Sequence, residues 1–480
     1  MAELHDLTAL AQAAAVKRRE VSPVELVDHY LERVQRRGTE LGAFVTVTAD
    51  AARAQAKEAE QRVAAEDSTR LPPLHGVPTA VKDLNLTAGV RTTLGSALFA
   101  DFVSPVDDHV VELLRRAGTI SLGKTNTPEF GLPCYTENAV APPARTPWDP
   151  ARSAGGSSGG AGAAVAAGLV PFAQGSDGGG SVRIPASVCG LVGIKVSRGR
   201  VSNGPVGGDV TGLAWNGPLA RNVRDAAALL DAMAVPMPGD PHWAPPLTGG
   251  ETFLSYAGRD PGRLRIGRWI DPVVAADAEV DPECVAAYEL ATKTLTDLGH
   301  EVEDVPAPFP PDVVAVFETV WSVSAQSAPV DPAREDELRP LTRWLRERGA
   351  ATTGAGFVGA VARMQMLSRH WIARTAGYDA VLSPTLASLP VPVGYFTDGG
   401  DPERDFERQK RFTPFTAVYN VTGQPAVSLP LHWTEPAGDR PTLPVGVMLA
   451  GRPAQEALLV SLSAQLEDAL PWEDRRPPNW

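Results

Sequence analysis

Cysteine is scarce in this sequence of 480 residues, which has three, Cys134, Cys189 and Cys284, and no close pair among them. Such widely separated cysteines give no disulfide framework, so we expect reduced thiols and a cytoplasmic location. No uncharged apolar run reaches about 18 residues, the length that a membrane-spanning helix needs. The first residues also lack the basic and apolar segments of a secretory signal. We therefore expect no membrane partner.

A run of basic residues is missing as well, and the formal net charge is −13. A phosphate-binding surface needs clustered lysine and arginine, so we do not expect nucleic acid as a partner. The eight histidines are scattered without the spacing of metal ligands. We therefore expect no metal site.

Glycine and serine are concentrated in two clusters, 155–160 (GGSSGG) and 175–181 (GSDGGGS). A flexible linker is the simplest interpretation, but the intervening stretch 161–169 (AGAAVAAGL) is small and apolar and suits a buried helix. Glycine-rich turns let the backbone approach a substrate and can direct several N–H groups at one point. Two such turns with serines, and Lys82 upstream, indicate a nucleophile, a second hydroxyl and an oxyanion hole for acyl transfer, with lysine as the base.

Elsewhere, short apolar strands alternate with helices, which predicts an α/β fold with a largely buried sheet. A capping box formed by Ser22 and Glu25 marks one helix start. The expected elements are a helix from 23, a strand at 43–48, a helix to about 65, a strand at 77–81, a helix at 108–117 and a strand at 119–122.

Two motifs of other enzyme classes occur. Residues 118–125 (GTISLGKT) match the phosphate-loop pattern, but their interior is strand-like where that motif needs a loop. Residues 156–160 (GSSGG) match the nucleophile elbow of α/β-hydrolases, which would make Ser158 the nucleophile and His432 a nominal base. The preceding segment is turn-rich rather than a strand. An esterase that uses Ser158 is kept as an alternative.

The two clusters, continued by 179–185 (GGSVRIP), resemble the amidase signature family of Ser-Ser-Lys amide hydrolases, including the 24-residue spacing from Ser157 to Ser181. The resemblance covers roughly 22–235 and 375–470. Flanking blocks that agree are 76–78, 81–83, 123–126, 147–149 and 423–426. The family implies the amidase signature fold: a mixed central β-sheet flanked by helices, in a single large domain with a partly helical cap region.

Four segments are expected within this domain. They are an N-terminal helical segment (1–67), the signature core with the catalytic residues (68–235), a variable, largely helical substrate-side region (236–372) and the C-terminal part of the core (373–480).

The resemblance implies that Ser181 is the nucleophile, that Ser157 lies on a cis peptide and relays the proton, and that Lys82 is the base. No metal or organic cofactor is needed. The oxyanion hole is expected from the N–H groups of Gly178, Gly179, Gly180 and Ser181. Supporting side chains are expected to be Asp83, Ser158, Ser176, Asp177 and Arg183.

A lysine with its ordinary pKa of about 10.4 is protonated at neutral pH and cannot act as a base. Burial at the end of the strand 77–81 lowers the pKa of Lys82, whereas direct contact with Asp83 raises it. The sequence alone leaves this balance open.

Position 178 is glycine where the family commonly carries a bulkier aliphatic residue, which indicates either a wider acyl pocket or a looser oxyanion loop. Tentative pocket residues are Cys134, Tyr135, Phe317, Trp321, Phe415 and Tyr419. Aromatic residues at helical spacing are more often core than pocket, and we lean slightly to core for Phe317 and Trp321.

The expected activity is hydrolysis of an uncharged, apolar or aryl amide or urethane, as in stand-alone amidases and in hydrolases of nylon oligomers, aryl amides and carbamates. Pro128 favours a stand-alone enzyme, because the glutaminase subunit of tRNA-dependent amidotransferases usually has an acidic residue there. A glutaminase-type subunit stays an alternative, and so does a catalytically silent scaffold. The expected partner is a small-molecule amide or carbamate, and a homodimer is one option for the oligomeric state.

Overall fold

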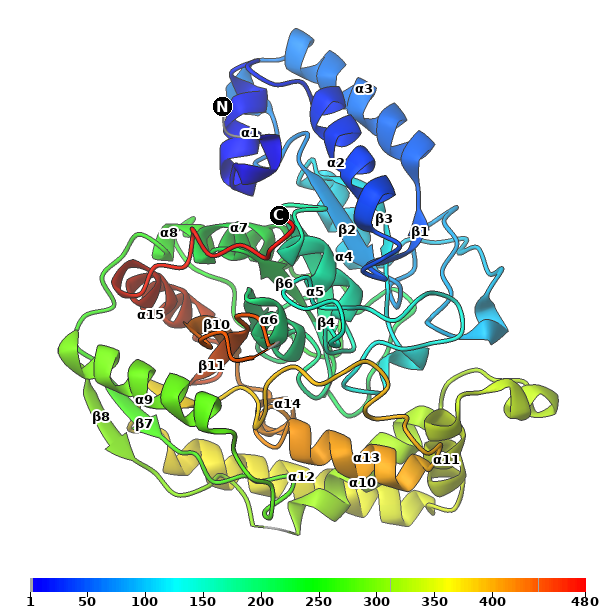
Figure 1. The fold of residues 1–480 in the computed structure, drawn as a ribbon, viewed down its shortest axis with the longest axis vertical. Coiled ribbons are helices and arrows are strands. Elements are labelled where there is room, and N and C mark those ends of the chain that lie inside the picture. Colours follow the sequence, from blue (N-terminus) through cyan, green and yellow to red (C-terminus); the bar gives the residue numbers. More distant parts are fainter. Residues whose placement is uncertain (1–2, 311, 439) are drawn as a thin grey trace.

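The computed structural model describes residues 3–310, 312–438 and 440–480, in which helices cover both faces of a large sheet (Figure 1). The helices are α1 (Ala9–Lys17), α2 (Pro23–Arg37), α3 (Ala49–Ala65), α4 (His109–Arg116), α5 (Gly159–Ala166), α6 (Arg183–Cys189), α7 (Val223–Met233), α8 (Phe253–Tyr256), α9 (Pro282–Asp297), α10 (Val313–Gln326), α11 (Pro340–Ala350), α12 (Gly354–Arg374), α13 (Pro402–Phe412), α14 (Val418–Thr422) and α15 (Glu456–Ala469). The strands are β1 (Phe44–Val47), β2 (Pro78–Lys82), β3 (Ile120–Thr125), β4 (Phe172–Asp177), β5 (Val192–Lys195), β6 (Trp215–Ala220), β7 (Arg265–Arg268), β8 (Glu301–Asp304), β9 (Ala380–Pro384), β10 (Ala426–Trp433) and β11 (Pro444–Gly451).

The described strands form two sheets, with the orders β1-β3-β2 and β4-β6-β5-β10-β11-β9-β7-β8. Both are mixed, since β2 runs parallel to β3 and β7 parallel to β9, while most other pairs are antiparallel. Two hydrogen bonds link the edge strands β2 and β4: the Thr79 hydroxyl donates to the Phe172 carbonyl at 3.4 Å, and the Lys82 N–H donates to Gln174 Oε1 at 2.8 Å. The mixed sheet flanked by helices is the predicted α/β fold, and the junction places Lys82 beside β4.

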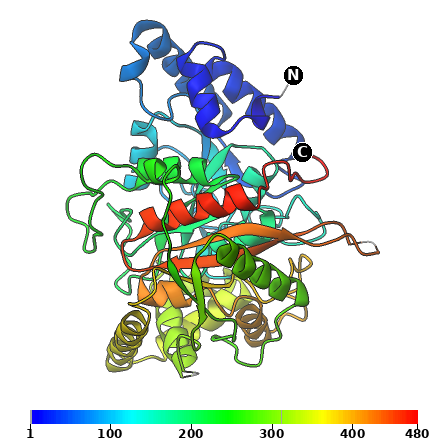
Figure 2. The same ribbon diagram turned by 90° about the vertical axis from the view of Figure 1, so that its left-hand side faces the viewer.

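The larger sheet is buried on both faces, because successive residues of its strands point to opposite faces and are apolar on both. Along β11, Val447 and Leu449 face the helices α7, α9 and α15, whereas Met448 and Ala450 face α12 and α14. Figure 2 shows α15 lying along the long strands β10 and β11. The helices α5 and α6, which flank the two glycine clusters, pack on the same face as α12 and α14.

The N-terminal predictions hold closely. The Ser22 hydroxyl accepts the Glu25 N–H at 3.1 Å, and the Glu25 carboxylate accepts the Ser22 N–H at 2.8 Å, so the capping box begins α2. The predicted strands at 43–48 and 77–81 are β1 and β2. The strand predicted at 119–122 continues to Thr125 as β3, so residues 123–125 lie in a strand and cannot form a phosphate loop.

The segment 236–372 is mostly helical, but it also contributes to the larger sheet. It contains α8 to α12, but it also supplies β7 and β8, the outer strands of the larger sheet. Its helices α10, α11 and α12 form a layer with α13 below the sheet in the view of Figure 1. In the part of the chain that the structure describes, no helix has the length and apolar character to cross a membrane.

Candidate active site

Lys82, the last residue of β2, has a fully buried side chain. Its Nζ lies 2.8 Å from the Ser157 hydroxyl and 3.0 Å from the Ser176 hydroxyl. Burial lowers the pKa of Lys82 to about 7, although the Asp177 charge acts in the opposite direction. The amine therefore loses its proton at a far lower pH than an ordinary lysine, and it can act as a base near neutrality.

Asp83 is turned away from Lys82. Its carboxylate accepts the Thr93 N–H at 2.9 Å and the Thr93 hydroxyl at 2.5 Å, and it lies 3.5 Å from Lys124 Nζ. Lys124 also donates to the Asn85 carbonyl. This second lysine offsets the charge of Asp83. Burial therefore determines the direction in which the pKa of Lys82 shifts, which the sequence alone left open.

Ser157 lies in the turn before α5, and its peptide bond with Gly156 is cis. The turn is held by α5, whose eight residues are all buried. A Cβ at Gly160 would lie 2.2 Å from the Asn126 backbone nitrogen, so only glycine allows this close backbone approach. The glycine and alanine content that argued against a linker therefore packs the helix that positions Ser157.

Ser181 lies in the loop between β4 and α6, and its carbonyl accepts the Ser158 N–H at 3.2 Å. This bond joins the two glycine clusters. The Gly180 N–H donates to Asp177 Oδ1 at 2.8 Å, so Gly180 does not supply a free oxyanion donor as expected. Within the described residues, the N–H groups of Gly178, Gly179 and Ser181 donate to no protein acceptor.

Asp177 and Arg183 form a fully buried ion pair under this loop, with Nη2 2.8 Å from Oδ1 and Nε 2.9 Å from Oδ2. Burial raises the pKa of the Asp177 carboxyl, but the charge and hydrogen bonds of Arg183 outweigh it and hold that pKa well below its usual range. A buried charge pair that also accepts backbone N–H groups fixes the local geometry. Both residues therefore support the Ser181 loop.

Two residues that the sequence reasoning missed brace the same loop from the C-terminal part. Asn420 on α14 donates through Nδ2 to the Asp177 carbonyl and to Oδ1, each at 2.9 Å. The Thr416 hydroxyl donates to the Gly179 carbonyl at 2.6 Å. More than 230 residues separate the partners in each case, and no local pattern connects them.

Ser181 opens onto a cavity of about 70 Å³ whose wall is mostly apolar. Cys134, Phe317 and Trp321 lie in this wall, as the tentative pocket assignment expected. The preference for Phe317 and Trp321 as core residues was wrong, because both rings face the cavity. The other lining residues are Leu132, Pro133, Gly179, Ile184, Val274, Val314, Glu318, Phe406, Gln409, Lys410, Thr413 and Ala417.

Two of the expected pocket residues belong to the core instead. Phe415 and Tyr419 are completely buried. The Phe415 ring lies 5.5 Å from that of Trp269, and the Tyr419 hydroxyl accepts the Trp269 Nε1–H at 3.3 Å. Their spacing suits a packed helix face, and that packing leaves no surface for a substrate.

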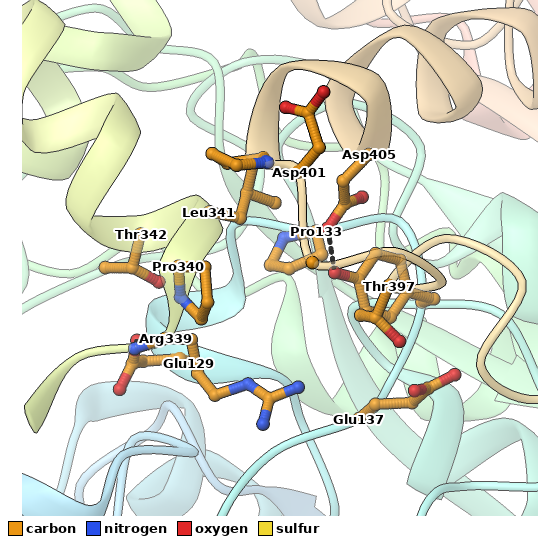
Figure 3. A pocket seen from close by; sticks show the side chains of 13 residues that line it. Glu129, Pro133, Glu137, Arg339, Pro340, Leu341, Thr342, Thr397, Asp401 and Asp405 are labelled. Carbon is orange, nitrogen blue, oxygen red and sulfur yellow. Dashed lines mark hydrogen bonds between the residues drawn. The ribbon is translucent and has the colours of Figure 1, made fainter.

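Tyr135, the last tentative pocket residue, lines a second cavity of about 140 Å³ (Figure 3). Its hydroxyl donates to Asp405 at 2.5 Å, and burial raises the pKa of Asp405 to about 6. Gln409, which lines the cavity at Ser181, accepts the Cys134 N–H at 2.9 Å and donates to Asp405, which lines the second cavity, at 2.8 Å. In Figure 3, the Arg339 guanidinium extends toward Glu137, whose carboxylate accepts the Gly394 N–H at 2.8 Å.

The esterase alternative finds no support. The Ser158 hydroxyl is fully buried, donates to the Ser176 carbonyl at 3.1 Å and accepts the Ser176 N–H at 3.2 Å. His432 pairs instead with Glu283 on α9 at 2.8 Å. Ser158 therefore positions Ser176, a partner of Lys82.

One group of side chains among the described residues has the spacing of metal ligands, namely Glu3, His5 and His29. The two imidazoles lie 3.1 Å apart and satisfy each other as donor and acceptor. This group belongs to the N-terminal segment and includes none of the residues around Ser181.

Comparisons with known proteins identify the family of this chain. The sequence model of the family described as "Amidase" matches residues 25–460. A putative amidase from Synechocystis sp. is 37% identical over 471 residues, covering 97% of this chain and 88% of its own. The structure of a 6-aminohexanoate cyclic dimer hydrolase complexed with substrate superposes with a TM-score of 0.89 at 33% identity, covering 99% of this chain and all of that one. A bacterial aryl acylamidase of the amidase signature family gives a TM-score of 0.84 at 27% identity, with 98% of each chain covered. The chain belongs to the amidase signature family of amide hydrolases.

Proposed function

We propose that this hydrolase is a stand-alone enzyme that cleaves an uncharged carboxylic amide, or the related urethane bond, through an acyl-enzyme on Ser181. The observation that carries the proposal is the Lys82–Ser157 contact. A buried amine with a pKa of about 7 lies 2.8 Å from a hydroxyl on the turn that joins the Ser181 loop. A base with this pKa can activate a serine near neutral pH, which an ordinary lysine cannot do.

In the acylation half, neutral Lys82 takes the Ser157 proton, Ser157 takes the Ser181 proton, and Ser181 Oγ bonds to the carbonyl carbon. The free N–H groups of Gly178, Gly179 and Ser181 supply donors for the developing oxyanion. Removal of one such donor typically costs about 3 kcal/mol of transition-state stabilisation. As the C–N bond breaks, the proton held by Lys82 returns through Ser157 to the departing amine.

In the deacylation half, a water molecule gives a proton to the same relay and its oxygen attacks the acyl carbon. The bond to Ser181 Oγ then breaks, and the relay returns the proton to that oxygen. The products are a carboxylic acid and an amine, and the enzyme regains its starting protonation state. Breaking the C–N bond of a urethane by the same steps would release an amine and a carbonic acid monoester.

The cavity at Ser181 favours an uncharged substrate. Its two charged side chains, Glu318 on α10 and Lys410 on α13, pair with each other at 2.7 Å. The remaining wall offers mainly apolar contacts, which reward the burial of apolar groups. The names of the structural relatives, a cyclic dimer hydrolase and an aryl acylamidase, make oligoamides and aryl amides the first candidates.

The test is amine release by the purified chain from aliphatic amides, anilides, a short nylon oligomer, an aryl carbamate and glutamine. We expect turnover of non-glutamine substrates, and a loss of at least about 10⁴-fold in Ser181→Ala. The matched control is Ser461→Ala, a buried serine on α15 that should leave turnover unchanged. Activity that survives in Ser181→Ala would contradict the proposal.

A glutaminase-type subunit is the second candidate, because Glu318 and Lys410 could hold the amino and carboxylate groups of glutamine if they separated. Glutamine as the sole substrate, or turnover that requires added partner subunits, would favour this candidate.

A further inference from the structure

The cavity at Ser181 lies on one side of the reacting bond. Its wall includes Ser181 and Gly179 but neither Ser157 nor Lys82. In the proposed mechanism Ser157 must reach the departing nitrogen, so the amine lies on the Ser157 side. The group that occupies this cavity is then the acyl group.

Gly178 faces Trp321. A Cβ at position 178 would lie 3.3 Å from Trp321 Cη2, 3.5 Å from its Cζ3 and 3.4 Å from the Ala214 Cβ. These distances are at the tight limit for one methyl group and leave no room for a branched side chain. The indole therefore occupies the space that a larger residue at 178 would need, so the glycine does not leave an open gap there.

Trp321 is also part of an aromatic wall. It lies one turn after Phe317 on α10, and the two rings stack with centroids 5.4 Å apart and an interplanar angle of 18°. The Phe317 Cζ lies 3.8 Å from a Cβ built on Gly179, so the wall is in contact with the nucleophile loop. Both rings are only half-buried, which leaves part of their surface free for contact with a ligand.

We propose that Gly178 and Trp321 form a complementary pair that determines acyl selectivity, and that the Phe317–Trp321 wall selects flat aromatic acyl groups over branched aliphatic ones. This inference rests on the proposed acyl-enzyme mechanism and names the substrate class for the same site. Planar rings gain from stacking on an aromatic wall, whereas a quaternary carbon does not fit between that wall and the loop.

The test compares 4-nitroanilides that share one amine and differ in the acyl group: benzoyl, hexanoyl and pivaloyl. We expect the wild type to prefer benzoyl. Trp321→Ala should lower the benzoyl-to-pivaloyl ratio of kcat/KM by about tenfold or more, because it removes the wall and opens space. An unchanged ratio overturns the inference.

A double-mutant cycle tests the pair itself. Gly178→Val should lower kcat/KM for every acyl group through its clash with the indole, and adding Trp321→Ala should recover part of that loss. A double variant whose loss equals the product of the two single losses overturns the pairing. If Gly178→Val does not fold, Gly178→Ala replaces it, since residue 178 has no left-handed φ and one methyl is only tightly accommodated.

Trp344→Ala is the matched control. Trp344 on α11 packs against Phe406 with centroids 5.6 Å apart and the rings tilted by 54°, but it does not line the cavity. It should leave the acyl ratio unchanged. A ratio that falls equally in Trp344→Ala shows a general packing effect and overturns the assignment.

A second series keeps the benzoyl group and varies the amine. Trp321→Ala should reduce kcat/KM by the same factor for each amine, and a factor that follows the amine overturns the placement of the acyl group. Failure of the proposed function is distinct, because it would appear in the wild type as absence of Ser181-dependent turnover. If this inference alone fails, the wild type is active, and Trp321→Ala does not change the ratio of kcat/KM between acyl groups.

Discussion

The signature core and the helical cover of the cavity are built in opposite ways. In the core, α5 consists of glycine, alanine and one valine, and every residue is buried, with Gly160 against the backbone of Ala43 and Asn126. In the cover, α10 and α13 place large side chains such as Phe317, Trp321 and Phe406 around the cavity. The Glu318–Lys410 ion pair, whose side chains are 18% and 12% exposed, connects these helices.

This difference separates chemistry from selectivity. A glycine this close to neighbouring backbone tolerates almost no substitution, so the turn that places Ser157 beside Lys82 is tightly constrained. Large side chains on surface helices can be exchanged at modest cost in stability. Substitutions on α10 and α13 should therefore change the substrate preference of this protein while its reaction stays the same.

Two buried lysines give the sharpest test of that separation. Burial lowers the pKa of both Lys82 and Lys195 to about 7, but Lys195 donates only to the carbonyls of Val196 and Gln424, at 2.7 and 2.8 Å. We expect Lys82→Met to lower kcat/KM by about 10³-fold or more, because it removes the base. Lys195→Met should stay within about tenfold of wild type. Equal losses, measured on variants with matching circular dichroism, would make Lys82 a structural residue.

Asp177→Asn should have the largest effect on stability. The substitution leaves the Arg183 guanidinium fully buried without a charged partner, and such a change costs about 3–5 kcal/mol of unfolding free energy. Urea denaturation of the variant and the wild type measures it. A cost below about 1 kcal/mol would mean that the pair contributes no more than a surface salt bridge.

The pH dependence should follow Lys82. The base must be neutral, and protonation below a pKa of about 7 removes its lone pair, so kcat/KM should rise about tenfold per pH unit up to that value and then level off. Lys195→Met, which retains the base, should show the same rising limb. A limb centred near pH 10 would mean that burial does not lower the pKa of Lys82.

Glu318→Gln should have the smallest effect. The carboxylate is partly exposed and Lys410 keeps Glu407 as a second partner, so we expect a change of at most about 1 kcal/mol in unfolding free energy. Urea denaturation under the conditions used for Asp177→Asn allows direct comparison. A loss as large as that of the Asp177 variant would contradict the contrast between core and cover.

Local patterns predicted the elements that depend on local sequence. The Ser22 capping box, the buried helix after Gly160 and the strands β1 and β2 all lie where their residues indicate. Burial at a strand end also suggested the pKa shift of Lys82. Surroundings that depend on distant residues could not be predicted in this way: the sequence does not show that Asp83 turns to Lys124 or that Gly180 donates to Asp177. For the same reason, Phe415 and Tyr419 could not be separated from Phe317 and Trp321, since all four occur in helical patterns and only packing decides which face a cavity.

The Asn420 contact sets an order of events during synthesis. Arg183 and Asn420 are 237 residues apart, and Asn420 closes the polar network that holds the Ser181 loop. The ribosome releases Lys82, Ser157 and Ser181 long before α14 emerges. A nascent chain therefore carries the complete motif while its nucleophile loop still lacks its last support, and the activity matures only when the final quarter of the protein has folded onto it.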